Sequence, residues 1–478
     1  MADVPHRALV RAVKGGRADE VARLLADPRT DPAAKDNKAI VEAAWWGCPA
    51  IAALLLAHPR TDPAARGGEA LRVAARWGFD EVVALLLGDP RVDPAAGDNE
   101  AVIGAAEEGR LDTLALLLAD PRVNPAARGC AALCCAARWG KTEVVALFLA
   151  DPRVDPAARD NKALRAAARG GETAVVALLL ADPRVDPAAR DNEAVIRVAA
   201  NVFPVTLALL LADPRVDPAA RGNEALCDAA RWGIVEVAAL LLADPRVDPT
   251  ARDNRALCAA AENGKAAVVA LLLADPRVDP AADDNAAIRL AADDGHAGVV
   301  SLLLADPRVD PTADDDMAVC AAASAGHEGV VARLLADPRV NPAARGYVAL
   351  FRAVECGHLG VEALLLADPR MGPAAPTLAL LTAALAGRDE SAARLLADPR
   401  ANPAALDLPE FAALRARPPV AKALAARRER RWSPLRAAWA AAVVSGSAAL
   451  ARADAAAARV DALAAAVADA LAEALAPC

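Results

Sequence analysis

The sequence predicts an all-α solenoid in which pairs of short helices stack along one direction, and two observations lead to this prediction. An Asp-Pro or His-Pro step recurs at one fixed interval, with its proline at Pro28, Pro59, Pro90 and so on to Pro369, and once more, slightly early, at Pro399. Between these steps lie two apolar stretches of helical spacing, separated in most periods by a glycine. One such helix pair cannot bury its own apolar face, so its stability has to come from stacking on neighbouring pairs.

The first helix of each repeat is illustrated by the unit from residue 160 to 190. Asn161 is expected to cap its start, because an asparagine oxygen accepts from the free amides of a first helical turn. Small side chains follow at helical spacing and would let a neighbouring helix approach closely: Ala163, Leu164, Ala167 and Ala168. Gly171 is placed to end the helix in a left-handed conformation.

The second helix is expected to start near Thr173 and to be buried on most sides. Its apolar residues are Val175, Val176, Leu178, Leu179 and Leu180. Asp182-Pro183 should end it, because proline disfavours α geometry in the residue before it. In the loop that follows, Val185 is the one apolar residue and is expected to plug the gap under the helix pair.

The pattern A-L-x-x-A-A-x-x-G-x-x-x-V-V-x-L-L-L, as in Ala70 to Leu87, resembles the ankyrin repeat, and the resemblance covers most of the chain. It implies paired antiparallel helices, loops at right angles to them, and a curved solenoid that binds partner proteins through its concave face and loop tips. The unit is slightly shorter than that of the family, and Asn99-Glu100-Ala101-Val102 stands where the family has T-P-L-H. Because two prolines in each loop remove amide donors, we expect little strand.

Three segments are expected along the chain. Residues 1–405 form an array of thirteen tandem repeats, 406–432 a degenerate C-terminal cap with a basic segment, and 433–478 an alanine-rich helical tail. Repeat seven departs from the pattern, because Val202 replaces the turn glycine. A β-branched residue at positive φ is costly, so this turn should take another shape.

The charge and composition of the sequence argue against several classes of protein. The net charge of −9 argues against a nucleic-acid partner, and no apolar run suits a signal peptide or a membrane-spanning helix. Equivalent cysteines of adjacent repeats, such as Cys227 and Cys258, lie too far apart for a disulfide. We therefore expect free, buried thiols and a cytoplasmic location.

A basic segment after the array is compatible with a second location of the protein in the cell. Residues 415–436 hold eight basic residues and one acid, including Arg427 to Arg431. The plain interpretation is a solvated helix end. The alternative is a targeting adaptor, in which the array holds cargo and the basic, amphipathic tail docks to the nucleus or to an anionic membrane.

The sequence gives little evidence of catalytic or metal-binding residues, and we expect no catalytic residue, metal site or cofactor. His296, His327 and His358 recur at the same position of successive repeats, too far apart to share one zinc ion. They match the Gly-His position of the ankyrin family, which implies a structural role between turns. The acidic stretch Asp314 to Asp316 lacks the glycine and closing glutamate of a calcium loop. The recurring Asp-Pro-Arg is also interpreted as structural, since a feature common to every repeat cannot select one partner.

Specificity is expected where the repeats differ. The two positions before the turn glycine hold five of the seven tryptophans, together with arginines. The candidate partner-binding residues are Trp45, Trp46, Arg76, Trp77, Arg138, Trp139, Arg231 and Trp232. Tryptophan and arginine dominate interface energies. The competing interpretation is that each tryptophan covers the end of its helix pair. The sequence thus predicts a non-catalytic module that binds a partner protein.

Overall fold

The computed structural model describes residues 3–407, 411–427, 429 and 430. Two compact units make up the chain, Met1–Asp283 and Asp284–Cys478. Both consist of helix pairs joined by loops, and the described residues contain no strand. The predicted all-α repeat architecture is therefore confirmed for the part of the chain that the structure describes, and the expectation of little strand agrees with it.

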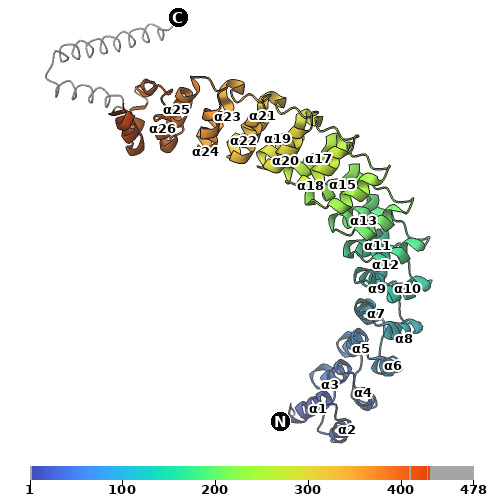
Figure 1. Ribbon diagram of the computed structural model, residues 1–478. Coiled ribbons are helices and arrows are strands. Elements are labelled where there is room, and N and C mark those ends of the chain that lie inside the picture. The colour runs from blue at the N-terminus through green and yellow to red at the C-terminus, as the bar shows by residue number, and fades with distance from the viewer. Residues whose placement is uncertain (1–2, 408–410, 428, 431–478) are drawn as a thin grey trace, which may run out of the picture. The chain divides into compact units, whose positions relative to one another are not determined.

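The helices alternate between a first and a second helix in each repeat (Figure 1). The first helices are α1 (Asp3–Lys14), α3 (Ala34–Trp45), α5 (Ala65–Trp77), α7 (Ala96–Glu108), α9 (Ala127–Arg138), α11 (Ala158–Gly170), α13 (Ala189–Ala200), α15 (Ala220–Trp232), α17 (Ala251–Glu262), α19 (Ala282–Asp293), α21 (Ala313–Ala325), α23 (Ala344–Cys356) and α25 (Ala375–Leu385). The second helices are α2 (Ala18–Leu25), α4 (Pro49–Leu56), α6 (Asp80–Leu87), α8 (Leu111–Ala119), α10 (Thr142–Ala150), α12 (Thr173–Ala181), α14 (Pro204–Leu211), α16 (Val235–Ala243), α18 (Ala266–Ala274), α20 (Ala297–Ala305), α22 (Glu328–Ala336), α24 (Leu359–Ala367) and α26 (Asp389–Leu395).

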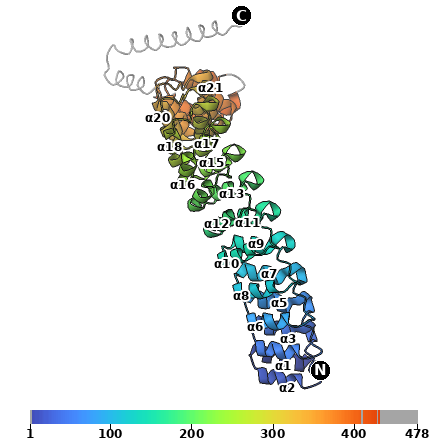
Figure 2. The ribbon, with the colours of Figure 1, turned by 90° about the vertical axis from the view of Figure 1, so that its right-hand side faces the viewer.

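Within the first unit, first helices contact first helices and second helices contact second helices, which gives two layers (Figures 1 and 2). The first helices approach one another more closely, because alanines such as Ala167 and Ala168 face the neighbouring pair and are fully buried. In the second layer Val175, Val176 and Leu179 are fully buried. Leu178 and Leu180 are only half-buried, so the second helix is covered on fewer sides than its composition suggested.

A left-handed turn precedes the regular part of each first helix from α3 to α23, and it corrects the expected cap. Arg159, Asp160 and Asn161 have φ of 55°, 55° and 56°. Asn161 does not cap its own helix; its Oδ1 accepts from the amide of Asp186, in the loop at the end of the same repeat, at 2.9 Å. Left-handed backbone costs most residues about 1–2 kcal/mol, and Gly, Asn and Asp tolerate it best. This explains why these three residue types recur at the second and third positions of the turn, whereas the first is most often arginine.

The turn between the two helices is left-handed as predicted, with Gly171 at φ 73°. Val202 contradicts the expectation for repeat seven, because it keeps the same left-handed conformation at φ 64°. The stacked neighbours impose the turn: Phe203, the residue after Val202, lies so close to Gly171 that a Cβ there would overlap its ring. The strain falls on Val202, whose side chain is about half exposed.

The loop after each second helix forms the edge of the array and is held by an arginine. In repeat six, α12 ends before Asp182, and Val185 fills the gap below as predicted, with 2% of its surface exposed. Arg184 forms an ion pair with Asp182 and donates to the carbonyls of Val154 and Leu149 in the preceding repeat, at 3.0 and 3.1 Å. Equivalent bonds to the preceding repeat recur at Arg91, Arg122, Arg153, Arg215, Arg246, Arg277 and Arg370.

Short helical segments follow the last full repeat, in the region where the sequence predicts a C-terminal cap. They comprise the 3-10 turn η1 (Pro403–Leu406), α27 (Ala412–Arg415) and helical residues 418–427. Arg427 donates to the carbonyls of Leu396 and Asp398, both at 2.7 Å, and to that of Ala401 at 2.6 Å. It therefore takes the place of the loop arginine that the next repeat would supply. The expected tail, residues 433–478, lies outside the described residues.

Candidate protein-binding face

Many of the side chains that vary between repeats lie on the first helices, and we call this surface the first-helix face. It comprises the positions from the first regular turn of each first helix to the residue before the turn glycine. All five candidate tryptophans lie at its end, with 41% to 62% of their surface exposed: Trp45, Trp46, Trp77, Trp139 and Trp232. Stacking of the repeats therefore leaves all five of these rings accessible to solvent.

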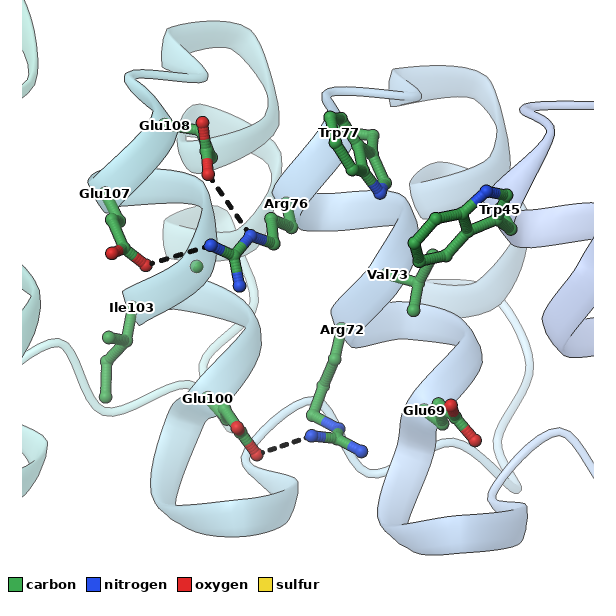
Figure 3. Close-up of a pocket in the computed structure, with 11 residues that line it drawn as sticks. Trp45, Glu69, Arg72, Val73, Arg76, Trp77, Glu100, Ile103, Glu107 and Glu108 are labelled. Carbon is green, nitrogen blue, oxygen red and sulfur yellow. Dashed lines mark hydrogen bonds and ion pairs between the residues drawn. The ribbon is translucent and has the colours of Figure 1, made fainter.

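A groove crosses the first-helix face between α3 and α7 and encloses about 410 Å³ (Figure 3). Trp45 and Trp77 form one wall, with ring centroids 5.7 Å apart and planes at 70°, an edge-to-face contact. Val73 and Ile103 add apolar surface to the groove. The aromatic pair holds both rings in place before any partner arrives, which reduces the entropy lost on binding.

Ion pairs between neighbouring first helices line the rest of the groove. Figure 3 shows Arg72 and Arg76 of α5 reaching toward glutamates of α7. Arg72 pairs with Glu100 at 2.7 Å, and Arg76 lies 3.5 Å from Glu107 and 3.2 Å from Glu108. These pairs fix the arginines. The lining of the groove holds four glutamates and two arginines, and the fourth glutamate, Glu69, pairs with Arg66 at 3.1 Å.

The remaining candidate residues lie outside this groove. Trp46 donates from Nε1 to Glu42 at 3.3 Å. The guanidinium of Arg138 lies over the ring of Trp139, 5.4 Å from its centroid, and Arg231 pairs with Asp228 at 3.4 Å. The structure thus brings Trp45, Arg76 and Trp77 together in one groove and leaves the pairs in repeats five and eight as separate sites along the face.

The comparison with known protein families gives a result that is consistent with stacked helix pairs. The family model for ankyrin repeats, in three copies, matches residues 102–191, 226–315 and 288–373. The chain belongs to the ankyrin-repeat family. Ankyrin repeats are generally protein–protein interaction modules without catalytic activity of their own. No curated protein matches the sequence of this ankyrin array.

Sequence reasoning missed the acidic side of the groove in the ankyrin array. Glu69, Glu100, Glu107 and Glu108 line it but were not among the candidates. The signal was present, because these glutamates occupy first-helix positions at which other repeats carry different residues. Aligning the repeats with one another shows which positions vary, but only the stacked helices show which variable residues share one groove.

The recurring histidines act between turns, as the resemblance implied. Nε2 of His327 lies 2.9 Å from the carbonyl of Asp293, and Nε2 of His358 lies 3.0 Å from that of Ser324, each in the preceding repeat. Among the described residues no group of histidines, cysteines and acids could hold a metal ion. The ankyrin array also has no helix, within its described part, with the length and apolarity that crossing a bilayer requires.

Most cysteines of the array are buried in its core. None of the eight in the described residues forms a disulfide. Burial raises the pKa of Cys134 to about 11, so this side chain is a neutral thiol at pH 7. Asp316 replaces the usual asparagine of the left-handed turn and accepts from the amide of Asn341 at 2.9 Å. Asp314 and Asp315 pair with Arg345 at 3.0 and 3.5 Å, so all three clustered acids have partners within the array.

Proposed function

We propose that this ankyrin array is a non-catalytic module that binds a partner protein through the first-helix face, with the groove between α3 and α7 at the centre of the contact. The observation that carries the proposal is the exposed edge-to-face pair of Trp45 and Trp77 in a groove rimmed by charges. Binding surfaces concentrate their energy in a few aromatic and arginine side chains surrounded by polar groups. Trp46 and Trp139, together with nearby loop tips, would extend the contact along the same face.

The exposed tryptophans argue against a purely structural role for them. A side chain that only covered the end of a helix pair would lose most of its exposed surface by doing so, whereas Trp46 and Trp139 keep about half. A tryptophan carries roughly 150–250 Å² of surface, and desolvating it against a partner is strongly favourable. Clustered exposed aromatic residues mark interaction sites in soluble proteins.

The proposal is tested by pulling down partners with the wild type and with a Trp45/Trp46/Trp77/Trp139→Ala variant. The matched control truncates exposed leucines of the second-helix layer in the same region: Leu85, Leu111 and Leu116. Circular dichroism verifies the fold of each variant. We expect the tryptophan variant to fold and lose its partners, while the leucine variant keeps them. If both variants retain the same partners, the tryptophans are not the binding surface.

The cytoplasmic location is part of the same proposal, with targeting through the basic tail as the alternative. The contacts of Arg427 with the last full repeat make it a residue of the cap, so a deletion that tests targeting has to spare it. A chain that ends at residue 430 keeps the described cap and lacks the rest of the basic segment. This truncated chain still carries six of the eight basic residues, so it tests the tail alone. An unchanged cellular location would reject targeting through the residues after 430, and relocation would support it.

A further inference from the structure

A second hollow lies on the first-helix face, across α9, α11 and α13 of the first unit. It encloses about 260 Å³ and has a floor of small side chains, including Cys134 and Cys135. Five of its lining residues are cationic and one is acidic, namely Arg138, Lys162, Arg165, Arg169, Arg197 and Glu193. We call it the basic hollow. Its charge is opposite in sign to that of the groove between α3 and α7.

The single acidic residue of the basic hollow already forms ion pairs within the array. Glu193 pairs with Arg165 at 2.7 Å and with Arg197 at 3.2 Å, and Arg190 approaches to 3.7 Å. Because Arg165 and Glu193 are each only 14% exposed, this pair is held firmly. One carboxylate thus faces three arginines, and the cluster keeps a net positive charge before the other cations are counted.

The other three cations have no acidic partner. Among the described residues, no carboxylate oxygen lies within the 4.0 Å of an ion pair from Arg138, Lys162 or Arg169. This differs from the groove, where Arg72 and Arg76 both pair with glutamates of the next repeat. Lys162 and Arg169 occupy the positions that Glu100 and Glu107 hold two repeats earlier. The same helix positions therefore carry opposite charges in repeats four and six.

We propose that the basic hollow binds a carboxylate-rich segment of the partner protein, an inference that rests on the proposed function of the first-helix face. Three unpaired cations around a hollow with a floor of small side chains suit a few carboxylates, which guanidinium groups bind through paired hydrogen bonds. Trp139, next to Arg138, offers an apolar contact beside them. A continuous polyanion fits worse, because the acid-rimmed groove on the same face would repel its extension.

The test measures fluorescence anisotropy of a dye-labelled octaglutamate peptide titrated with the full chain in about 50 mM NaCl, where screening is moderate. A Lys162→Glu/Arg169→Glu variant reverses two charges of the hollow. The control is Arg333→Glu/Arg352→Glu, which makes the same change in net charge at exposed arginines of the second unit. We expect the wild type and the control to bind alike and the hollow variant to bind at least about tenfold more weakly.

Three results would overturn the proposal. Octaglutamate that does not bind the wild type, or that loses affinity equally in the hollow variant and the control, excludes a specific site. A single-stranded oligodeoxynucleotide of equal charge that binds the hollow more tightly than octaglutamate would assign it to phosphates instead. The pull-down with the tryptophan variant is a separate readout: if that variant keeps its partners while octaglutamate still needs the hollow, the proposed groove fails and the acidic-peptide site stands.

Discussion

The loop edge and the first-helix face of the array both carry arginines, but these arginines have opposite roles. At the loop edge, Arg184 uses its donors on Asp182 and on two carbonyls of the preceding repeat, and the same arrangement recurs along the edge. On the first-helix face, Arg169 has no carboxylate partner among the described residues, and the corresponding residue changes from repeat to repeat. The uniform arginines connect repeats, whereas the variable ones remain available to a partner.

The largest expected effect comes from breaking the loop edge. Arg184→Ala removes two bonds to the preceding repeat, the part-buried one to the carbonyl of Val154 and the exposed one to that of Leu149. We therefore expect a loss of about 1–3 kcal/mol in the free energy of unfolding. Urea unfolding followed by circular dichroism measures it. Arg169→Ala is the control and should change stability by less than about 0.5 kcal/mol. Equal losses in the two variants would contradict the division between edge and face.

A somewhat smaller effect is expected from the left-handed turn. Asn161→Ala removes the acceptor for the amide of Asp186 and places alanine at φ 56°, so it should cost roughly 1–2 kcal/mol. Asn161→Asp keeps an acceptor, as Asp316 does toward Asn341, and should cost less. The same unfolding experiment compares the two variants. A smaller loss for alanine than for aspartate would show that the bond to the loop is unimportant.

The two smallest expected effects depend on pH, and the first concerns the ion pair of the loop edge. Arg184 lowers the pKa of Asp182 through its hydrogen bonds, so this stabilisation is present above the ordinary value of 3.8 and is lost as pH falls through the folded-state pKa. We expect Asp182→Asn to cost roughly 0.5–1 kcal/mol at pH 7 and less at pH 3, which lies below the ordinary pKa of 3.8. Unfolding measured at both pH values checks this, and an equal cost at both would contradict the role of the ion pair.

Glu362, in the second unit, should show the opposite dependence of stability on pH. It is 2% exposed and accepts from Ser391 Oγ, and burial raises its pKa. The stability that Glu362 contributes is therefore fully present below its ordinary pKa of 4.5 and is lost as pH rises through the raised pKa. Glu362→Gln should accordingly stabilise the second unit on the order of 1 kcal/mol at pH 7 and have little effect near pH 4. A variant that is less stable than wild type at pH 7 would contradict this.

The repeat pattern was sufficient to predict the helix pairs, the glycine turn and the plug at Val185, because these depend on local spacing and recur in each unit. The left-handed turn was missed, since Asn161 suits both a helix cap and a left-handed residue, and only the loop packed beside it decides between them. Val202 was misjudged for a related reason: stacked neighbours impose a conformation that its own preference opposes.

The candidate site was predictable only in part. Exposure of the tryptophans follows from their place before the turn, which can be located in the sequence. The pairing of Trp45 with Trp77 and the convergence of cations from three repeats depend on how adjacent first helices line up, and a list of variable positions does not contain that alignment.

Oxidative footprinting of the wild type, with and without a captured partner, tests the central claim most directly. Tryptophan side chains oxidise readily when exposed, and mass spectrometry reads the oxidation of each one. We expect the partner to slow oxidation of Trp45, Trp46 and Trp77 about fivefold or more, as burial in an interface requires, and to leave the loop edge unchanged. Unprotected tryptophans together with a protected loop edge would contradict the account and would make the uniform edge the binding surface.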